Sequence, residues 1–161
     1  MPDFTMAPAR LQAFLDQPLY ASVTSLRRTG APFTAPLGFI HEEGCVYLTV
    51  GGTRPVIQRI TRDPRICVCV FDQDFPPSYV IMEGRAAVME DPGHAISMRI
   101  GRKYMTRVPG LDLAAFEKNW LAEGRTVFRM PVENYLSTDG KLITNFEEDA
   151  SISPVEHRRR Q

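Results

Sequence analysis

Long hydrophobic runs, a net charge and a cysteine framework are all missing from this sequence. The longest uninterrupted apolar run is the six-residue segment 66–71, far below the length of about 20 residues that crosses a bilayer as a helix. Nineteen basic residues balance nineteen acidic ones, which argues against a nucleic-acid-binding protein. Three cysteines in no disulfide-like spacing indicate a reducing compartment, and the first residues show no signal-peptide pattern. We therefore expect a cytoplasmic protein with neither a membrane nor a nucleic acid as partner.

Motifs for the commonest catalytic chemistries are missing as well. The sequence contains no P-loop, no GxSxG and no GxGxxG. His41, His94 and His157 are far apart and none stands in a metal-ligand spacing, so we predict no metal site and assign no catalytic residue. Cys67 and Cys69 lie two apart on an expected strand, and we expect all three cysteines to be reduced packing residues.

What is present is an ordinary globular composition on a chain of one-domain length. The chain has 161 residues, of which 43% are hydrophobic and 24% charged. These values predict a single domain with its own core. We place that domain at residues 1–140 and a loosely ordered tail at residues 141–161, which ends in Arg158–Arg160.

Alternating apolar residues separated by short glycine turns predict an antiparallel meander, because parallel strands need longer crossovers. The expected strands are 19–26, 32–41, 45–50, 65–72, 79–90, 125–130 and 132–138, and the expected helices are 8–17, 56–62, one that starts at Asp91-Pro92, and 111–123. Strand 65–72 is apolar on both faces and should lie in the middle, and Gly84 should mark a bulge or a bend of the barrel. The predicted fold is mainly β (α+β), with six or seven antiparallel strands in a small barrel and peripheral helices.

One strand-to-helix connection has the residues of an anion site. Gly51–Pro55 follows a strand and opens a helix, with Thr53 as the expected N-cap and Pro55 in the first turn. Helix N-terminal N–H groups attract anions, glycine allows close approach, and Arg54 and Arg59 would add charge-assisted hydrogen bonds. An ordinary glycine-rich connection with solvated arginines is the other interpretation.

Several short motifs occur in a characteristic order along the chain. They are Pro36-Leu37-Gly38-Phe39, Thr49-Val50-Gly51-Gly52-Thr53, the run from Arg59 through Arg62-Asp63-Pro64-Arg65 to Ile66, Met82-Glu83-Gly84-Arg85-Ala86, and Phe128-Arg129-Met130-Pro131. In this order and spacing, the chain resembles the pyridoxamine 5′-phosphate oxidase-like family of split β-barrels, most clearly between Leu11 and Glu90.

The resemblance implies a flavin- or deazaflavin-dependent oxidoreductase that acts on a small molecule. It also implies a homodimer with two cofactor sites at the subunit interface. By the same resemblance, the cofactor phosphate would lie at Gly51, Gly52, Thr53, Arg54 and Arg59, and the ring would lie against Pro36, Gly38, Phe39, Thr49 and Val50. Ser22 and Thr24 would either hydrogen-bond near the ring or face solvent.

The chain departs from the family pattern on the helix after the glycines. Many members carry Lys and Asn where this sequence has Val56 and Arg59. The missing lysine argues slightly against the standard mode of FMN binding. The excess of 16 arginines over 3 lysines is typical of GC-rich genomes, where users of deazaflavin are common. FMN and coenzyme F-420 therefore both stay open.

Other functions on the same barrel have different requirements. A non-catalytic protein that binds flavin, haem or a bilin is the alternative to an oxidoreductase. A pyridoxamine-phosphate oxidase proper would need further basic groups for a second phosphate, and only Arg158–Arg160 offers a comparable cluster. The sequence does not identify a substrate, whose pocket we expect between residues 72–78 and 92–123.

Overall fold

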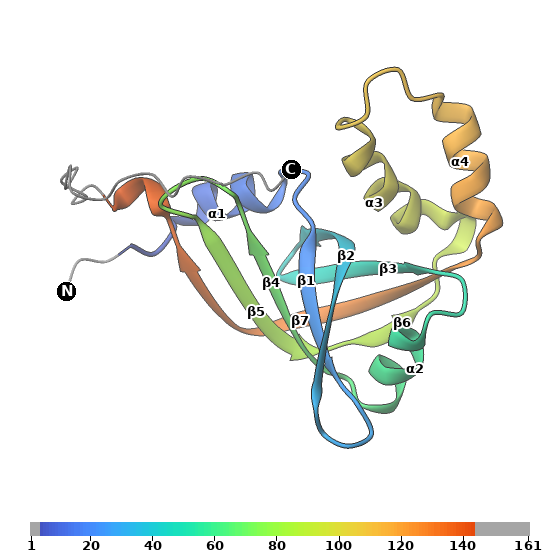
Figure 1. Cartoon of the computed structure of the whole chain (residues 1–161), viewed down its shortest axis with the longest axis horizontal. Coiled ribbons are helices and arrows are strands. Elements are labelled where there is room, and N and C mark those ends of the chain that lie inside the picture. Colours follow the sequence, from blue (N-terminus) through green and yellow to red (C-terminus); the bar gives the residue numbers. More distant parts are fainter. Residues whose placement is uncertain (1–3, 144–161) are drawn as a thin grey trace, which may run out of the picture.

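Six antiparallel strands close into a barrel in the computed structural model, which describes residues 4–143 (Figure 1). The strand order is β3-β2-β1-β4-β5-β7, and pairing of β3 with β7 closes the ring, while β6 adds an extra strand beside β7. The predicted antiparallel small barrel is therefore confirmed. Within the described residues, no helix is long and apolar enough to span a membrane.

The elements follow the predicted order. The strands are β1 (Ala21–Leu26), β2 (Pro32–Glu42), β3 (Cys45–Gly51), β4 (Arg65–Phe71), β5 (Tyr79–Arg85), β6 (Ala87–Met89) and β7 (Arg125–Thr138). The helices are α1 (Pro8–Leu15), α2 (Pro55–Arg62), α3 (Ala95–Met105) and α4 (Leu113–Ala122), with 3₁₀ turns at Pro92–His94 and Gly140–Leu142. The second 3₁₀ turn contains the first two residues of the predicted tail, and Arg158–Arg160 lie outside the described residues.

Two strand boundaries differ from the prediction. The two expected C-terminal strands are one continuous strand, β7, which pairs with β3 and β6 up to Pro131 and with β5 from Val132 onward. The expected strand 79–90 is divided into β5 and β6 at Ala86, whose N–H donates to the Pro64 carbonyl. The register shift at Glu83/Gly84 confirms the predicted bulge.

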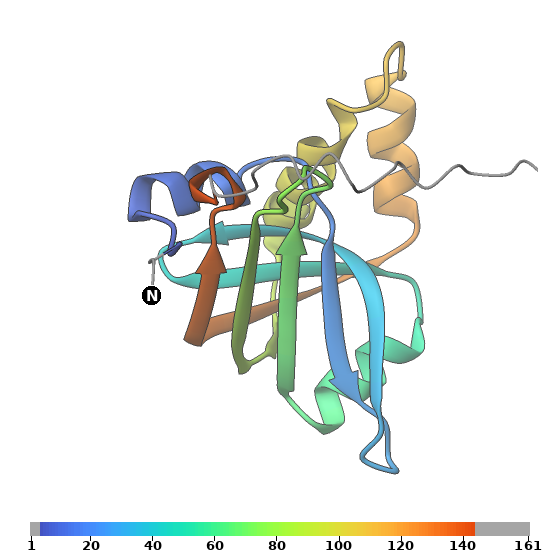
Figure 2. The same ribbon diagram turned by 60° about the vertical axis from the view of Figure 1, so that its left-hand side comes forward.

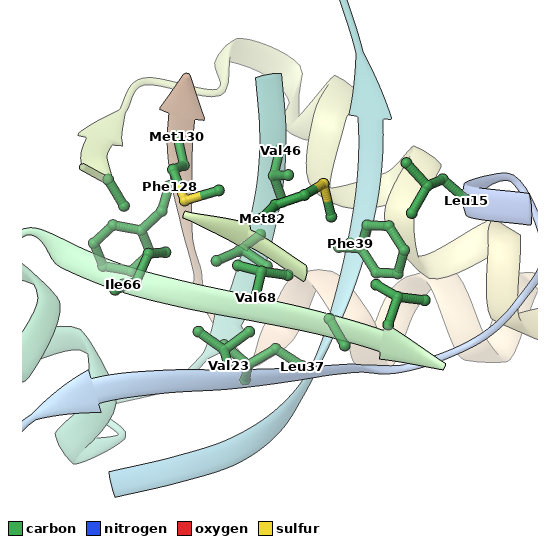
Figure 3. Packing of buried hydrophobic residues seen from close by; sticks show 14 of the residues in the cluster. Leu15, Val23, Leu37, Phe39, Val46, Ile66, Val68, Met82, Phe128 and Met130 are labelled. Atoms are coloured by element: carbon green, nitrogen blue, oxygen red, sulfur yellow. The ribbon is translucent and has the colours of Figure 1, made fainter. Parts of the chain in front are cut away.

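The barrel interior is filled by the alternate residues of the strands. Val23 of β1, Val68 of β4, Met82 of β5 and Phe128 of β7 point inward and are almost fully buried (Figure 3). β4 lies in the middle of the strand order, as predicted. Its other face, which carries the cysteines at 67 and 69, is only half-buried, so one face of this strand is core.

The helices cover the ends and one side of the barrel. Figure 2 shows α1, α3 and α4 at one end and α2 at the other, beside the β1–β2 hairpin. Val56 and Ile60 of α2 are buried in the barrel core, so this helix closes its end of the barrel. α3 packs on β2, β3 and β7.

The split of the barrel lies between β2 and β3. β2 pairs with β1 from Pro32 to Leu37 and with β3 only from Gly38 onward. The last residue pair between β2 and β3 is Gly38 with Thr49, beyond which the strands diverge and β3 leads into α2 (Figure 1). The predicted anion site follows directly after this point of divergence.

Candidate cofactor site

The turn that joins β3 to α2 is fixed to a second turn from far along the chain. Gly52 has a φ of +63°, a conformation that favours glycine, and its N–H donates to the carbonyls of Glu123 (3.2 Å) and Gly124 (2.9 Å). The Gly52 amide is therefore already used by the chain. The β3–α2 turn must offer a ligand its later N–H groups.

The N-cap of α2 lies one residue later than predicted, although the helix includes Pro55 before the expected range 56–62. Arg54, with φ −60° and ψ 139°, is the N-cap, so the prediction of Thr53 as N-cap was wrong. Pro55 takes the first helical position, as expected, and no side chain caps the helix. Pro55 has no N–H and the Ile57 N–H donates to the Arg54 carbonyl (3.0 Å), so Val56 carries the first-turn N–H that lacks an acceptor in the helix, at the partly positive end of α2. Because Thr53 and Arg54 are exposed, an anion can reach this helix end.

Thr49 carries a polar group that the protein leaves unpaired. Its side chain is buried, with the residue 4% exposed, and its Oγ1 has no hydrogen-bond partner in the described part of the chain. A buried hydroxyl without a partner costs about 1–3 kcal/mol. Thr49 precedes Gly51 by two residues on β3, so both residues face the same side of the sheet. A ligand at this point of the barrel would give the hydroxyl a partner.

The residues predicted to lie against the ring have different exposures. Pro36 is exposed on the outer face of the barrel. Gly38 lies under α3, where an added Cβ would stand 3.0 Å from Tyr104 Cε2 and 3.1 Å from Ile100 Cγ2. Phe39 and Val50 are core residues at 0% and 1% exposure, so their side chains present no surface to a ligand.

Arg59 is not at the helix N-terminus with Arg54. Its guanidinium lies 3.9 Å from the ring centroid of Phe33, and the guanidinium of Arg27 lies 4.8 Å from the same centroid. Arg59 therefore contributes to a cation–π contact between α2 and β2. The structure brings together Thr49 and the Gly51–Arg54 turn, and it separates Arg59 from them. That these residues hold a cofactor stays a prediction.

Arg125 was missed by the sequence analysis. It is the first residue of β7 and pairs with Gly51, and its side chain is 9% exposed. Its guanidinium carbon lies 3.2 Å from the Trp120 ring centroid, and Nη2 donates to Glu123 (2.7 Å). Burial lowers the pKa of Arg125, Glu123 raises it and Arg54 lowers it. The signal in the sequence is only a charged Glu-Gly-Arg turn before a strand.

The fold and these residues agree with one family. Residues 7–138 match the family model described as pyridoxamine 5′-phosphate oxidase. The chain belongs to this family. No curated protein sequence matches the chain.

Solved structures with this barrel are similar to the chain at low sequence identity. A conserved hypothetical protein from Mycobacterium tuberculosis has a TM-score of 0.72 at 19% identity, covering 88% of this chain and 89% of its own. An F420 reductase has a TM-score of 0.63 at 20% identity, covering 84% and 98%. A heme storage protein from Vibrio cholerae has a TM-score of 0.64 at 8% identity, covering 81% and 94%. At these identities, the likeness shows the shared fold.

In this family member, the outer face beside Pro36 is hollowed. Ser22 and Pro36 line a hollow of about 470 Å³ together with Phe71, residues 72–74 and Arg107. Residues 72–74 and Arg107 belong to the two segments predicted to border a substrate pocket. Thr24 bonds through its hydroxyl to the Thr34 hydroxyl at 2.8 Å. Among residues 4–143, no three His, Cys, Asp or Glu side chains are grouped to hold a metal ion.

Proposed function

We propose that the chain binds a phosphate-bearing flavin-type cofactor, FMN or F-420, and is an oxidoreductase that exchanges a hydride with a small molecule. Membership of the family supports the proposal. The observation that carries it is the unpaired, buried Thr49 hydroxyl, on the end of β3 that leads, five residues later, to the N-cap position of α2, which no side chain caps. Both cofactors supply the hydride chemistry themselves, so the chain needs no catalytic dyad.

The residues present fit the phosphate end of such a cofactor. Thr53, Arg54 and the backbone N–H of Val56 would hold the phosphate, and Thr49 would donate to the ligand. Val56 is 5% exposed and packs in the core, so its side chain has no polar role at this turn. Pro36, which is exposed on β2, would lie beside the ring. Since FMN and F-420 share the phosphate, this end of the site accepts either.

We also propose that the protein is a homodimer that joins through the outer face of β1, β4, β5 and β7. The register places Cys69, Ile81 and Leu136 in one row across that face, and Phe71 and Tyr79 in the next. Leu136 is 54% exposed and Phe71 48% exposed, so this face presents large apolar side chains to solvent in the monomer. Sedimentation should give twice 18.2 kDa for the native chain and 18.2 kDa for Leu136→Asp. A native chain that sediments as a monomer at micromolar concentration would contradict the proposed dimer.

The test of cofactor binding is a fluorescence titration with FMN and with F-420, together with an absorbance spectrum of the complex. Thr49→Val gives the sharpest variant because its two expected effects differ in sign. Loss of an unpaired buried hydroxyl should raise the free energy of unfolding, whereas loss of a ligand hydrogen bond should weaken cofactor binding roughly tenfold.

Arg54→Ala should weaken binding by about one to two decades, with Arg28→Ala, an exposed arginine of the β1–β2 hairpin, as the matched control. If neither cofactor binds, or if Thr49→Val is stabilised and binds as well as the native chain, the proposal is wrong. Tight binding without hydride transfer to any acceptor would favour a carrier.

A further inference from the structure

The β3–α2 turn and the α4–β7 turn form one surface, although they are about seventy residues apart in sequence. The Gly52 N–H donates to carbonyls of the α4–β7 turn, and Gly51 is the ladder partner of Arg125. An anion held at Thr53 and Arg54 would therefore lie beside residues 123–125.

Arg125 is held as a planar, largely buried donor at this junction. Its guanidinium carbon lies over the Trp120 ring, 3.2 Å from the centroid, its Nε donates to the Trp120 carbonyl (3.3 Å) and its Nη2 donates to Glu123. The remaining terminal nitrogen, Nη1, lies 3.3 Å from the position that a Cβ of Gly51 would take. The absence of a side chain at Gly51 is what leaves space on this side of the guanidinium.

Glu123 occupies that space. Its Oε2 lies where a Cβ of Gly51 would stand, between the turn and Arg125. The Glu123 side chain is 53% exposed, so it can rotate into solvent at little cost, and exposed ion pairs of this kind contribute little stability.

We propose that Arg125 is a second ligand for the phosphate of the cofactor, and that Glu123 holds its place until the phosphate displaces it. This inference rests on the proposed function for the location of the phosphate. Two observations independent of the helix end support it: the Arg125 side chain is nine-tenths buried with its Nη1 beside Gly51, and the Thr49 hydroxyl on the same face of β3 as Gly51 is unpaired. A planar guanidinium is suited to bidentate contact with phosphate oxygens.

Trp120 provides the readout, because it is the only tryptophan in the chain and it is stacked under Arg125. The native chain is titrated with inorganic phosphate at constant ionic strength, with chloride as the balancing salt, and Trp120 emission is recorded. Phosphate should give a saturable change that chloride does not. Glu123→Gln removes the competing carboxylate and should lower the half-saturating concentration two- to fivefold, in the range of about one exposed ion pair.

Arg125→Gln should raise the half-saturating concentration roughly tenfold or more, and Arg125→Lys should recover only part of this loss. Glu117→Gln is the matched control, because Glu117 of α4 also forms an ion pair with an arginine, Arg102 of α3, away from the β3–α2 turn. It should titrate like the native chain. If Arg125→Gln does not fold, the titrations of Glu123→Gln and Arg125→Lys still test whether Arg125 binds phosphate.

FMN and riboflavin, which differ by the phosphate, connect this subsite to the cofactor. The Glu123 and Arg125 variants should change FMN affinity in opposite directions and leave riboflavin affinity unchanged. Phosphate and FMN titrations that are the same for Glu123→Gln, Arg125→Lys and the native chain would overturn the inference and leave the proposed function intact. If phosphate responds as expected and neither FMN nor F-420 binds, the anion subsite stands and the proposed function fails.

Discussion

Removal of the Tyr104 hydroxyl should show that its hydrogen bonds hold α3 against β2. Tyr104 of α3 accepts a hydrogen bond from the Phe39 N–H (3.0 Å) and donates to the Leu19 carbonyl (3.0 Å). Its ring stacks on Tyr20 at 4.6 Å and covers Gly38. Tyr104→Phe keeps the ring and its stacking and deletes both hydrogen bonds.

The magnitude follows from these two bonds. Each contributes about 1 kcal/mol net, and the Phe39 N–H, which is partly buried, loses its acceptor. We expect Tyr104→Phe to lower the free energy of unfolding by about 2–3 kcal/mol. With a urea m-value of about 2 kcal/mol/M for a small domain, the unfolding midpoint should fall by roughly 1 M.

Urea denaturation followed by circular dichroism measures this difference, and Tyr20→Phe is the matched control. Tyr20 is 55% exposed, and its hydroxyl makes no hydrogen bond to the described residues, so its midpoint should stay at the native value. Burial raises the pKa of Tyr104 to about 12, so the folded chain holds this proton more tightly than the unfolded chain. The native protein should therefore lose stability as the pH rises above about 10, and Tyr104→Phe should lack that loss. Equal urea midpoints for Tyr104→Phe and Tyr20→Phe would refute the idea that the Tyr104 hydroxyl holds α3 against the barrel.

Three further outcomes can be checked on the same protein. Burial lowers the pKa of Lys103 to about 8, so the unfolded chain binds more protons than the native chain between pH 8 and 10.5. The free energy of unfolding should therefore rise by about 2 kcal/mol over this range, allowing for solvent screening. Urea midpoints at pH 7.5 and 10 should show this rise for the native chain and no such rise for Lys103→Met. Gly84→Ala should destabilise by about 1–3 kcal/mol in thermal or urea unfolding, because its Cβ would meet the Pro131 carbonyl oxygen and Met130 Cγ (2.9 Å); a native-like midpoint would contradict this. Cys67 and Cys69, half-buried with thiol pKa values raised by burial, should be alkylated slowly in the native protein and faster above pH 9, whereas Cys45 should react only after denaturation; instant modification of all three would disprove it.

The fold was largely predictable because its determinants are local. Alternation of apolar residues set the faces of β1 and β4, and glycine turns set the antiparallel connections. The continuity of β7 was missed since Pro131, which has no N–H to donate, interrupts the alternation. At that residue β7 changes its partner from β3 to β5, so one strand has the pattern of two.

The predicted site was correct where sequence neighbours stay neighbours in space. Thr49 and the Gly51–Arg54 turn lie together because they end one strand and begin one helix. Arg54 and Arg59 look equivalent in the sequence, but five residues along a helix correspond to a rotation of about 140° between them. Arg59 therefore turns away to Phe33, while Arg54 stays at the helix N-terminus.

Arg125 could not be found from local motifs, because its position depends on one register pair between β3 and β7. That pairing places Arg125 opposite Gly51, at the turn whose family lysine is replaced by Val56. Since Val56 packs in the core, α2 itself supplies no cation in its first turn, and a guanidinium from another strand stands beside the same turn. We infer that the charge lost from the helix is replaced in space by Arg125.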